Sequence, residues 1–184
     1  FLESLYDKVN MDNVRNVYLS DTGLNKRDKE YVKSFDKVKI VDSGIVTNFK
    51  GGSWGEDWHK TVASKTIILR ELLSNNDLPI VMVDGDCIFV KDISSLIDSN
   101  YDIQLCKRDA GTPYLGSFVI GQPTKVTSEF MKKWIERIDT KPTNVPRESP
   151  SLSEVAEENR SLLKIGDIDR ILVSTHWESE FSDD

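Results

Sequence analysis

The stretch DLPIVMVDGDCIFVKD, residues 77–92, decides how the rest of the sequence is interpreted. Its apolar run 80–83 is typical of a strand covered on both faces, and it ends on Asp84 and Asp86 with Gly85 between them. Burying a carboxylate is costly unless it is paired or holds a metal. Ligands of open α/β sheets bind beyond the carboxyl ends of the strands, so the sequence predicts a site here.

The carboxylate pair has the chemistry of a metal site. Side chains alternate along a strand, which predicts that Asp84 and Asp86 point to the same side. Two hard oxygen ligands suit Mg²⁺ or Mn²⁺, which usually share phosphate oxygens with a substrate. Gly85 has no side chain and would let that ligand approach the backbone. The simpler alternative is a pair of solvated turn residues, since Asp and Gly are common in turns.

The composition limits the class of protein. A chain of 184 residues with 38% hydrophobic content predicts one folded domain over residues 1–184, and its abrupt ends leave open whether terminal elements are missing. The net charge of −7 argues against a nucleic-acid partner. Without a signal peptide or an apolar run of about 18 residues, we expect a cytoplasmic protein with no membrane span. Cys87 and Cys106 are expected to be reduced thiols.

Strand and helix patterns alternate along the chain. This order predicts an α/β domain with a mostly parallel central sheet flanked by helices. Strands are expected at residues 16–20, 38–41, 80–83, 101–106, 117–121 and 170–174, and helices at 26–35, 58–73, 128–138 and 151–163.

Three segments, taken in order, resemble the GT-A glycosyltransferases, the nucleotide-diphospho-sugar transferase superfamily. NVYLSDTGL (16–24) is similar to an early strand and turn of these enzymes, and WHKTVASKTIILRELL (58–73) to the helix before their D-x-D strand. YLGSFVIG (114–121) is similar to their acceptor-side strand. The small size of the chain is similar to that of phage-type members of the family. The resemblance implies a GT-A-like (Rossmann-like) fold. If the protein is encoded by a phage, the expected location is the host cytoplasm.

The resemblance also implies an activity, namely transfer of a sugar from a nucleotide-diphosphate donor, expected to be a UDP-sugar, to a glycan, lipid or protein acceptor. Mn²⁺ or Mg²⁺ would bridge the two phosphates of the donor and stabilise the leaving group. Asp84 would lie near the ribose or the metal, with Gly85 beside it, and Asp86 would bind the metal. Asp21 would contact the base and Lys65 the phosphates, although a turn residue and a surface lysine are equally simple interpretations.

Other site residues are predicted by the same resemblance. His176 is the candidate for a third metal ligand. Glu154 is chosen as the catalytic base from a group that also holds Glu148, Glu157 and Glu158, although a charged helix face would explain all four. Asp109 is a second catalytic candidate; with its neighbour Arg108 and with Asp102, it would contact the donor sugar or the acceptor.

Two other functions stay open at this point. A haloacid-dehalogenase-type phosphatase would use Asp84 as nucleophile and Asp86 as general acid. Against it, 83 residues precede Asp84, and Cys87 and Ile88 follow the pair where that family has a glycine and a threonine or valine. A non-catalytic nucleotide-sugar binder is the other alternative.

Overall fold

Two sheets form the framework of the computed structural model, which describes residues 1–45, 56–108, 111–142 and 147–169. The larger sheet has four strands in the order β3-β5-β4-β6, and the smaller one is the parallel pair β1-β2. The strands are β1 (Val17–Asp21), β2 (Val38–Asp42), β3 (Ile80–Val83), β4 (Ile103–Lys107), β5 (Tyr114–Gly121) and β6 (Ile165–Ile168).

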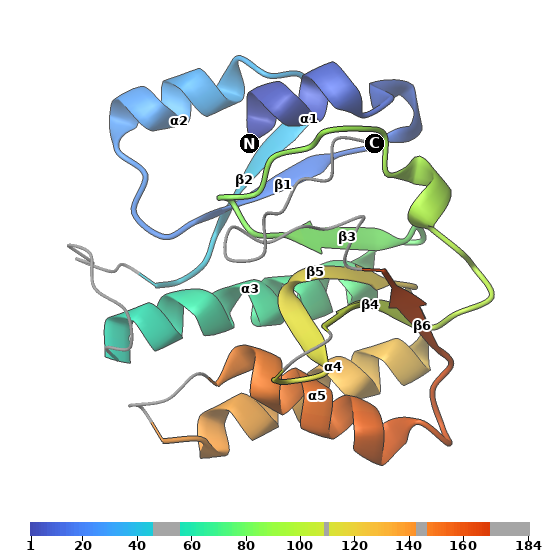
Figure 1. Cartoon of the computed structure of the whole chain (residues 1–184). Helices are drawn as coiled ribbons and strands as arrows, with labels where there is room; N and C mark the ends of the chain where they lie inside the picture. Colours follow the sequence, from blue (N-terminus) through green and yellow to red (C-terminus); the bar gives the residue numbers. More distant parts are fainter. Residues whose placement is uncertain (46–55, 109–110, 143–146, 170–184) are drawn as a thin grey trace.

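Helices cover the strands on two sides (Figure 1). Two of them pack with β1 and β2, and three form the layer against the larger sheet. β2 and β3 both end on the side of the molecule where α3 begins (Figure 1). The helices are α1 (Leu2–Lys8), α2 (Lys26–Lys33), α3 (Glu56–Asn75), α4 (Lys125–Thr140) and α5 (Glu148–Asn159), with short 3-10 turns at Met11–Asn13 and Ser94–Leu96.

The larger core lies between the four-stranded sheet and helices α3, α4 and α5. Trp134 of α4 is fully buried there, and its indole Nε1 donates a hydrogen bond to the Glu148 carbonyl oxygen at 3.0 Å. Each such side chain stabilises the fold by about 1.5–3 kcal/mol through burial. The other members of this core are Leu69, Leu73, Met82, Ile103, Leu105, Tyr114, Val119, Phe130, Met131, Ile138, Leu152, Val155, Ala156 and Leu163.

The α/β class is confirmed, but the prediction of a mostly parallel central sheet is wrong. β5 pairs antiparallel with both β3 and β4, and only the β4–β6 pair of that sheet is parallel. For the β4–β5 pair, the physical reason is the short connection 108–113, because a parallel crossover needs about a dozen residues or more.

Several element bounds differ from the expectation for local reasons. α4 begins before residue 128 because the Thr124 side chain caps it, accepting a hydrogen bond from the Thr127 N–H at 3.1 Å. α5 begins at Glu148, since Pro150 falls in the first turn, where a helix needs no N–H. β6 was not predicted, because Gly166 and Asp167 interrupt its apolar pattern. The strand expected at 170–174 lies outside the described residues.

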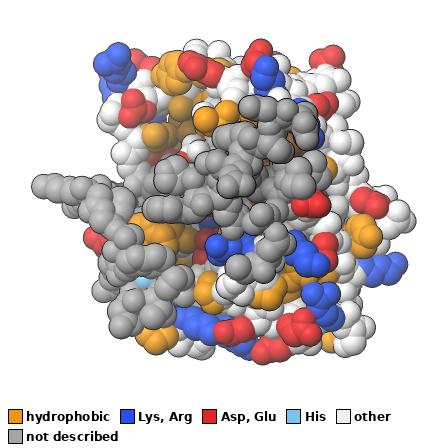
Figure 2. All heavy atoms as spheres, in the orientation of Figure 1, with side chains coloured by type: hydrophobic (Ala, Val, Ile, Leu, Met, Phe, Trp, Pro, Cys, Tyr) orange, Lys and Arg blue, Asp and Glu red, His pale blue; other side chains and the backbone are white. Residues whose placement is uncertain are grey.

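Among the described residues, no helix combines the length and the apolar character that a membrane crossing needs. Cys87 and Cys106 do not form a disulfide with each other. On the face drawn in Figure 2, the basic and acidic side chains of the described residues are interspersed. The mixed surface reflects a chain with 24 basic and 31 acidic residues.

The burial of Trp134 gives a test of the fold. We expect Trp134→Phe to lower the free energy of unfolding by about 1–3 kcal/mol, because it removes buried volume and the hydrogen bond to the Glu148 carbonyl. Urea denaturation measures the change. Val126→Ala on the same helix, at a side chain that is 43% exposed, should change it by less than about 0.5 kcal/mol. Equal effects of the two substitutions would contradict the described packing.

Candidate functional site

The predicted carboxylate pair lies in a turn at the end of β3. The Asp84 N–H still donates to the Ser117 carbonyl of β5 at 3.0 Å, but the strand ends at Val83. The Cys87 N–H then donates to the Asp84 carbonyl at 3.1 Å, which closes a turn over residues 84–87. The alternation of a strand therefore does not extend across the pair, and the argument that placed both carboxylates on one side does not apply.

Asp84 belongs to a cluster of three charged side chains from three elements. The Lys65 ammonium of α3 contacts the Asp84 carboxylate, and it lies 2.7 Å from Oε1 of Glu148 at the start of α5. The side chains of Lys65, Asp84 and Glu148 are 17%, 31% and 13% exposed. One half-buried cation therefore joins the end of β3 to the beginning of α5.

Burial and mutual attraction act against each other in this cluster. Burial by itself would lower the pKa of Lys65, but the charges of Glu148 and Asp84 outweigh it and raise that pKa above its ordinary value. Burial raises the pKa of Glu148 to about 7, although Lys65 favours the charged carboxylate. A carboxyl group that titrates near neutral pH can both accept and donate a proton under physiological conditions.

Contacts with β5 and α4 fix the position of Glu148. The Gly116 N–H of β5 donates to Oγ of Ser149 at 3.1 Å, and Trp134 holds the carbonyl of Glu148. A Cβ atom on Gly116 would lie 2.6 Å from Cδ and Oε1 of Glu148. A side chain at position 116 would therefore displace the Glu148 carboxylate from its present position.

Asp86 differs from Asp84 in being open to solvent. Within the described part of the chain, its carboxylate makes no ion pair or hydrogen bond, and Gly85 is exposed with no atom within 4 Å of where a Cβ would lie. The segment is anchored further along, where the Phe89 N–H donates to Oγ of Ser4 at 3.1 Å and the ring packs 5.5 Å from that of Phe1. Gly85 and Asp86 therefore lie on an anchored segment and are accessible to a ligand.

The two aspartates supply the type of oxygen ligand that a hard divalent cation prefers. Asp86 offers a free carboxylate, and Asp84 contacts Lys65 through one oxygen, Oδ1. No group of three or more potential ligands occurs among the described residues, so water and substrate oxygens would complete the shell. Mg²⁺ and Mn²⁺ tolerate such partial protein ligation.

A cavity of about 330 Å³ opens beside Glu148. It lies between the start of α3, the connection from β4 to β5, and the start of α5. Neither Asp84 nor Asp86 lines it. The lining residues are Trp58, Arg108, Thr112, Arg147, Glu148, Ser149 and Pro150.

Asp21 lies at the end of β1 and closes the turn that leads to α2. One carboxylate oxygen accepts the N–H groups of Gly23 at 2.9 Å and Leu24 at 2.7 Å, and the other pairs with Lys29 at 2.6 Å. The hydrogen bond from Lys29 is the largest of these effects, and together they lower the pKa of Asp21 to about 2. Both oxygens of Asp21 are thus engaged in holding the turn.

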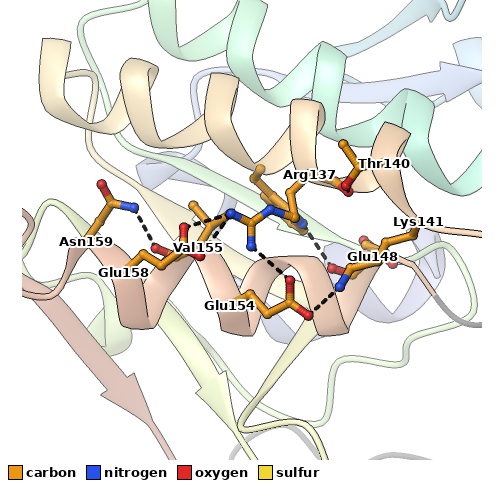
Figure 3. A network of polar contacts seen from close by, with 9 residues as sticks. Arg137, Thr140, Lys141, Glu148, Glu154, Val155, Glu158 and Asn159 are labelled. Atoms are coloured by element: carbon orange, nitrogen blue, oxygen red, sulfur yellow. Dashed lines mark hydrogen bonds and ion pairs between the residues drawn. The ribbon is translucent and has the colours of Figure 1, made fainter.

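Glu154 does not join the cluster at Lys65. Arg137 Nη1 of α4 lies 2.9 Å from its Oε2, and Lys141 contacts its other oxygen (Figure 3). Lys141 first, and then Arg137, lower the pKa of Glu154, which keeps its carboxylate charged. Arg137 also bonds both oxygens of Glu158, at 2.9 and 2.8 Å, so this network fastens α4 to α5.

Glu148 is therefore the glutamate that reaches the cluster, although the sequence prediction chose Glu154. The helical periodicity of the sequence could have indicated Glu148. This residue precedes the buried Leu152 and Val155 by four and seven positions, so the three lie on one helix face. Glu154 is out of that register. Because the helix was expected to begin at residue 151, the periodicity was not extended to residue 148.

The remaining candidates fall elsewhere. Asp109 and His176 lie outside the described residues. Asp102 accepts a hydrogen bond from the Lys164 N–H at 2.9 Å and helps to seat β6 beside β4. Arg108 lines the cavity.

Comparison with known families supports the resemblance seen in the sequence. The chain matches the family model described as nucleotide-diphospho-sugar transferase over residues 20–181. The chain belongs to this family. Membership implies a nucleotide-sugar donor, and it supports the GT-A-like fold class. The comparison with curated proteins finds no match. The matched range includes α3, β3 and α5, and hence every residue of the cluster at Lys65.

The close approach of Gly116 to Glu148 predicts a sensitive position. Gly116→Ala should lower the free energy of unfolding by about 1–3 kcal/mol, because the new methyl group forces the Glu148 side chain away from its pocket. Gly85→Ala serves as the stability control, since its methyl group would meet open space, and should cost less than about 0.5 kcal/mol. Urea unfolding of both variants decides; a harmless Gly116→Ala would contradict the described contact.

The raised pKa of Glu148 predicts a pH dependence of stability. A carboxyl whose pKa rises from 4.5 to about 7 on folding contributes stability that is full below pH 4.5 and is lost as the pH rises through 7. Gln cannot titrate. The free energy of unfolding of Glu148→Gln relative to wild type should therefore increase from pH 5 to pH 8, by on the order of 1–3 kcal/mol.

The matched control is Glu154→Gln on the same helix. Its carboxyl has a lowered pKa, so both the folded and the unfolded forms stay charged over most of this range. Its stability relative to wild type should stay nearly constant from pH 5 to pH 8. Thermal unfolding in metal-free buffer measures both variants, and a flat or falling curve for Glu148→Gln would refute the assignment.

Proposed function

We propose that this chain is a glycosyltransferase that uses a UDP-sugar donor with Mn²⁺ or Mg²⁺ and transfers the sugar to an acceptor. One observation carries the proposal. At the end of β3, the exposed carboxylate of Asp86 follows closely in sequence on the charged cluster of Asp84, Lys65 and Glu148. Family membership supports the donor class. The carboxyl end of a strand in an α/β sheet is also the common place for a nucleotide ligand.

Each residue of the site has a role in this proposal. Asp86 and Asp84 would hold the metal, which supplies positive charge to the diphosphate leaving group. Lys65 holds Asp84 and Glu148 in position and adds a positive charge near the same phosphates. Gly85 leaves room for the donor to approach the backbone.

Glu148 replaces Glu154 as our candidate for the group that contacts the reacting sugar or acceptor. It lines the cavity, contacts Lys65, and has a pKa of about 7, which suits proton transfer near neutral pH. Glu154 is held by Arg137 and Lys141 on another face of α5. In the described part of the chain, Glu148 is the glutamate that lines this cavity.

Calorimetry with UDP tests the proposal. We expect UDP to bind in the presence of Mn²⁺, and Asp86→Asn to weaken binding at least about ten-fold, because a charged oxygen ligand of the metal is lost. Asp12→Asn makes the same change of charge at an exposed site before the start of β1 and should leave binding unchanged.

Turnover distinguishes an enzyme from a binder. A screen of nucleotide-sugars with and without Mn²⁺ should show hydrolysis or transfer from a UDP-sugar, and Glu148→Gln should reduce it while UDP binding persists. Binding without turnover of any donor would indicate a non-catalytic binder. Release of phosphate from a phosphomonoester with Mg²⁺, without affinity for UDP, would contradict the proposal.

A further inference from the structure

Among the described residues that line the cavity beside Glu148, basic side chains outnumber acidic ones. Arg108 lines one part of it, from the end of β4, and Arg147 lines another, directly before α5. Within residues 1–45, 56–108, 111–142 and 147–169, no carboxylate lies within 4 Å of either guanidinium. The acid that lines the cavity, Glu148, is paired with Lys65 instead. Among the described residues, the two arginine charges therefore have no carboxylate counter-ion.

The two arginines are also placed to donate hydrogen bonds. Nε of Arg108 is buried and has no hydrogen-bond partner in the described part of the chain, an arrangement that is costly unless a ligand accepts from it. Arg147 donates from Nε to the Pro142 carbonyl at 2.9 Å, which fixes the plane of its guanidinium. Its outer nitrogens have no acceptor among the residues that the structure describes. Planar guanidinium groups bind carboxylates and phosphates through paired hydrogen bonds.

The start of α5 adds to this preference. The helix begins at Glu148 without a side-chain cap on its first turn, so the partial positive charge of its N-terminus faces the same region as the arginines. The hydroxyl of Thr112 and the ring of Trp58 complete a lining that is partly polar and partly apolar, as a sugar ring requires. A volume of about 330 Å³ is at the small end of the range for ligand pockets.

We propose that this cavity binds a sugar carrying a carboxylate or phosphate, with Arg108 and Arg147 as the residues that recognise the anion. The inference rests on the proposed transferase function and adds the class of sugar to it. The anion is distinct from the diphosphate of the donor, because Asp84 and Asp86, which would hold the metal and diphosphate, do not line the cavity. The charged sugar is either the one transferred or part of the acceptor.

Two binding measurements separate these sources. The first compares UDP-glucuronate with UDP-glucose in the presence of Mn²⁺. The second compares free glucuronate with free glucose on protein saturated with UDP and Mn²⁺. We expect the anionic member to bind at least about ten-fold more tightly in one comparison, as one charged hydrogen-bonded pair would give. A preference in the first assigns the charge to the donor, and in the second to the acceptor.

Substitutions identify the residues responsible. Arg108→Gln and Arg147→Gln should bring the ratio of affinities for the anionic and the neutral sugar close to one. The affinity for UDP should stay unchanged. Arg108→Lys keeps the positive charge but loses the planar guanidinium group, so it should retain part of the preference for the anionic sugar. Arg27→Gln on the exposed face of α2 is the matched control and should keep the full preference. Circular dichroism confirms that each variant is folded.

The contradicting results are equally defined. Equal binding of anionic and neutral sugars in both comparisons would overturn the inference, as would a preference that survives both Arg→Gln substitutions. Absence of UDP binding would count against the proposed transferase function instead. In that case the comparison of glucuronate with glucose, repeated without UDP, still tests the cavity by itself.

Discussion

The ammonium group of Lys65 is the constraint on which the site depends. Two carboxylates, one from the end of β3 and one from the start of α5, approach each other in a half-buried region because a cation lies between them. Without it, the two negative charges would repel each other away from bulk water, which costs several kcal/mol in a protein interior. A single side chain of α3 thus holds together elements that are more than sixty residues apart in sequence.

The packing of α4 and β5 positions Glu148 for its contact with Lys65. Trp134 fills the core between α4 and the larger sheet, and its indole fixes the backbone of Glu148. Gly116 leaves the space on β5 into which the Glu148 side chain fits. Stability and site geometry are therefore coupled, because a change in the core at α4 or in the middle of β5 also moves the carboxylate that faces the cavity.

The sequence predicted the parts of this arrangement that depend on local pattern. The apolar run at 80–83 is a strand that ends directly before Asp84, as predicted. Lys65, which the family resemblance placed near the donor phosphates, contacts Asp84. The antiparallel pairing of β5 was not predicted, because strand direction depends on which strands become neighbours. Glu148 was missed in favour of Glu154 for a similar reason: burial by another element, here β5 at Gly116, distinguishes two glutamates of one helix.

The most direct test of this account is a double-mutant cycle between Lys65 and Glu148 at pH 8, where Glu148 is ionised. Lys65→Met alone leaves two carboxylates without their cation, whereas adding Glu148→Gln removes one of these charges. The account predicts that the double variant is more stable than the sum of the single effects by about 1–3 kcal/mol, measured by urea unfolding. Effects that add to within about 0.3 kcal/mol would contradict it, because Lys65 would then not hold Glu148 in place.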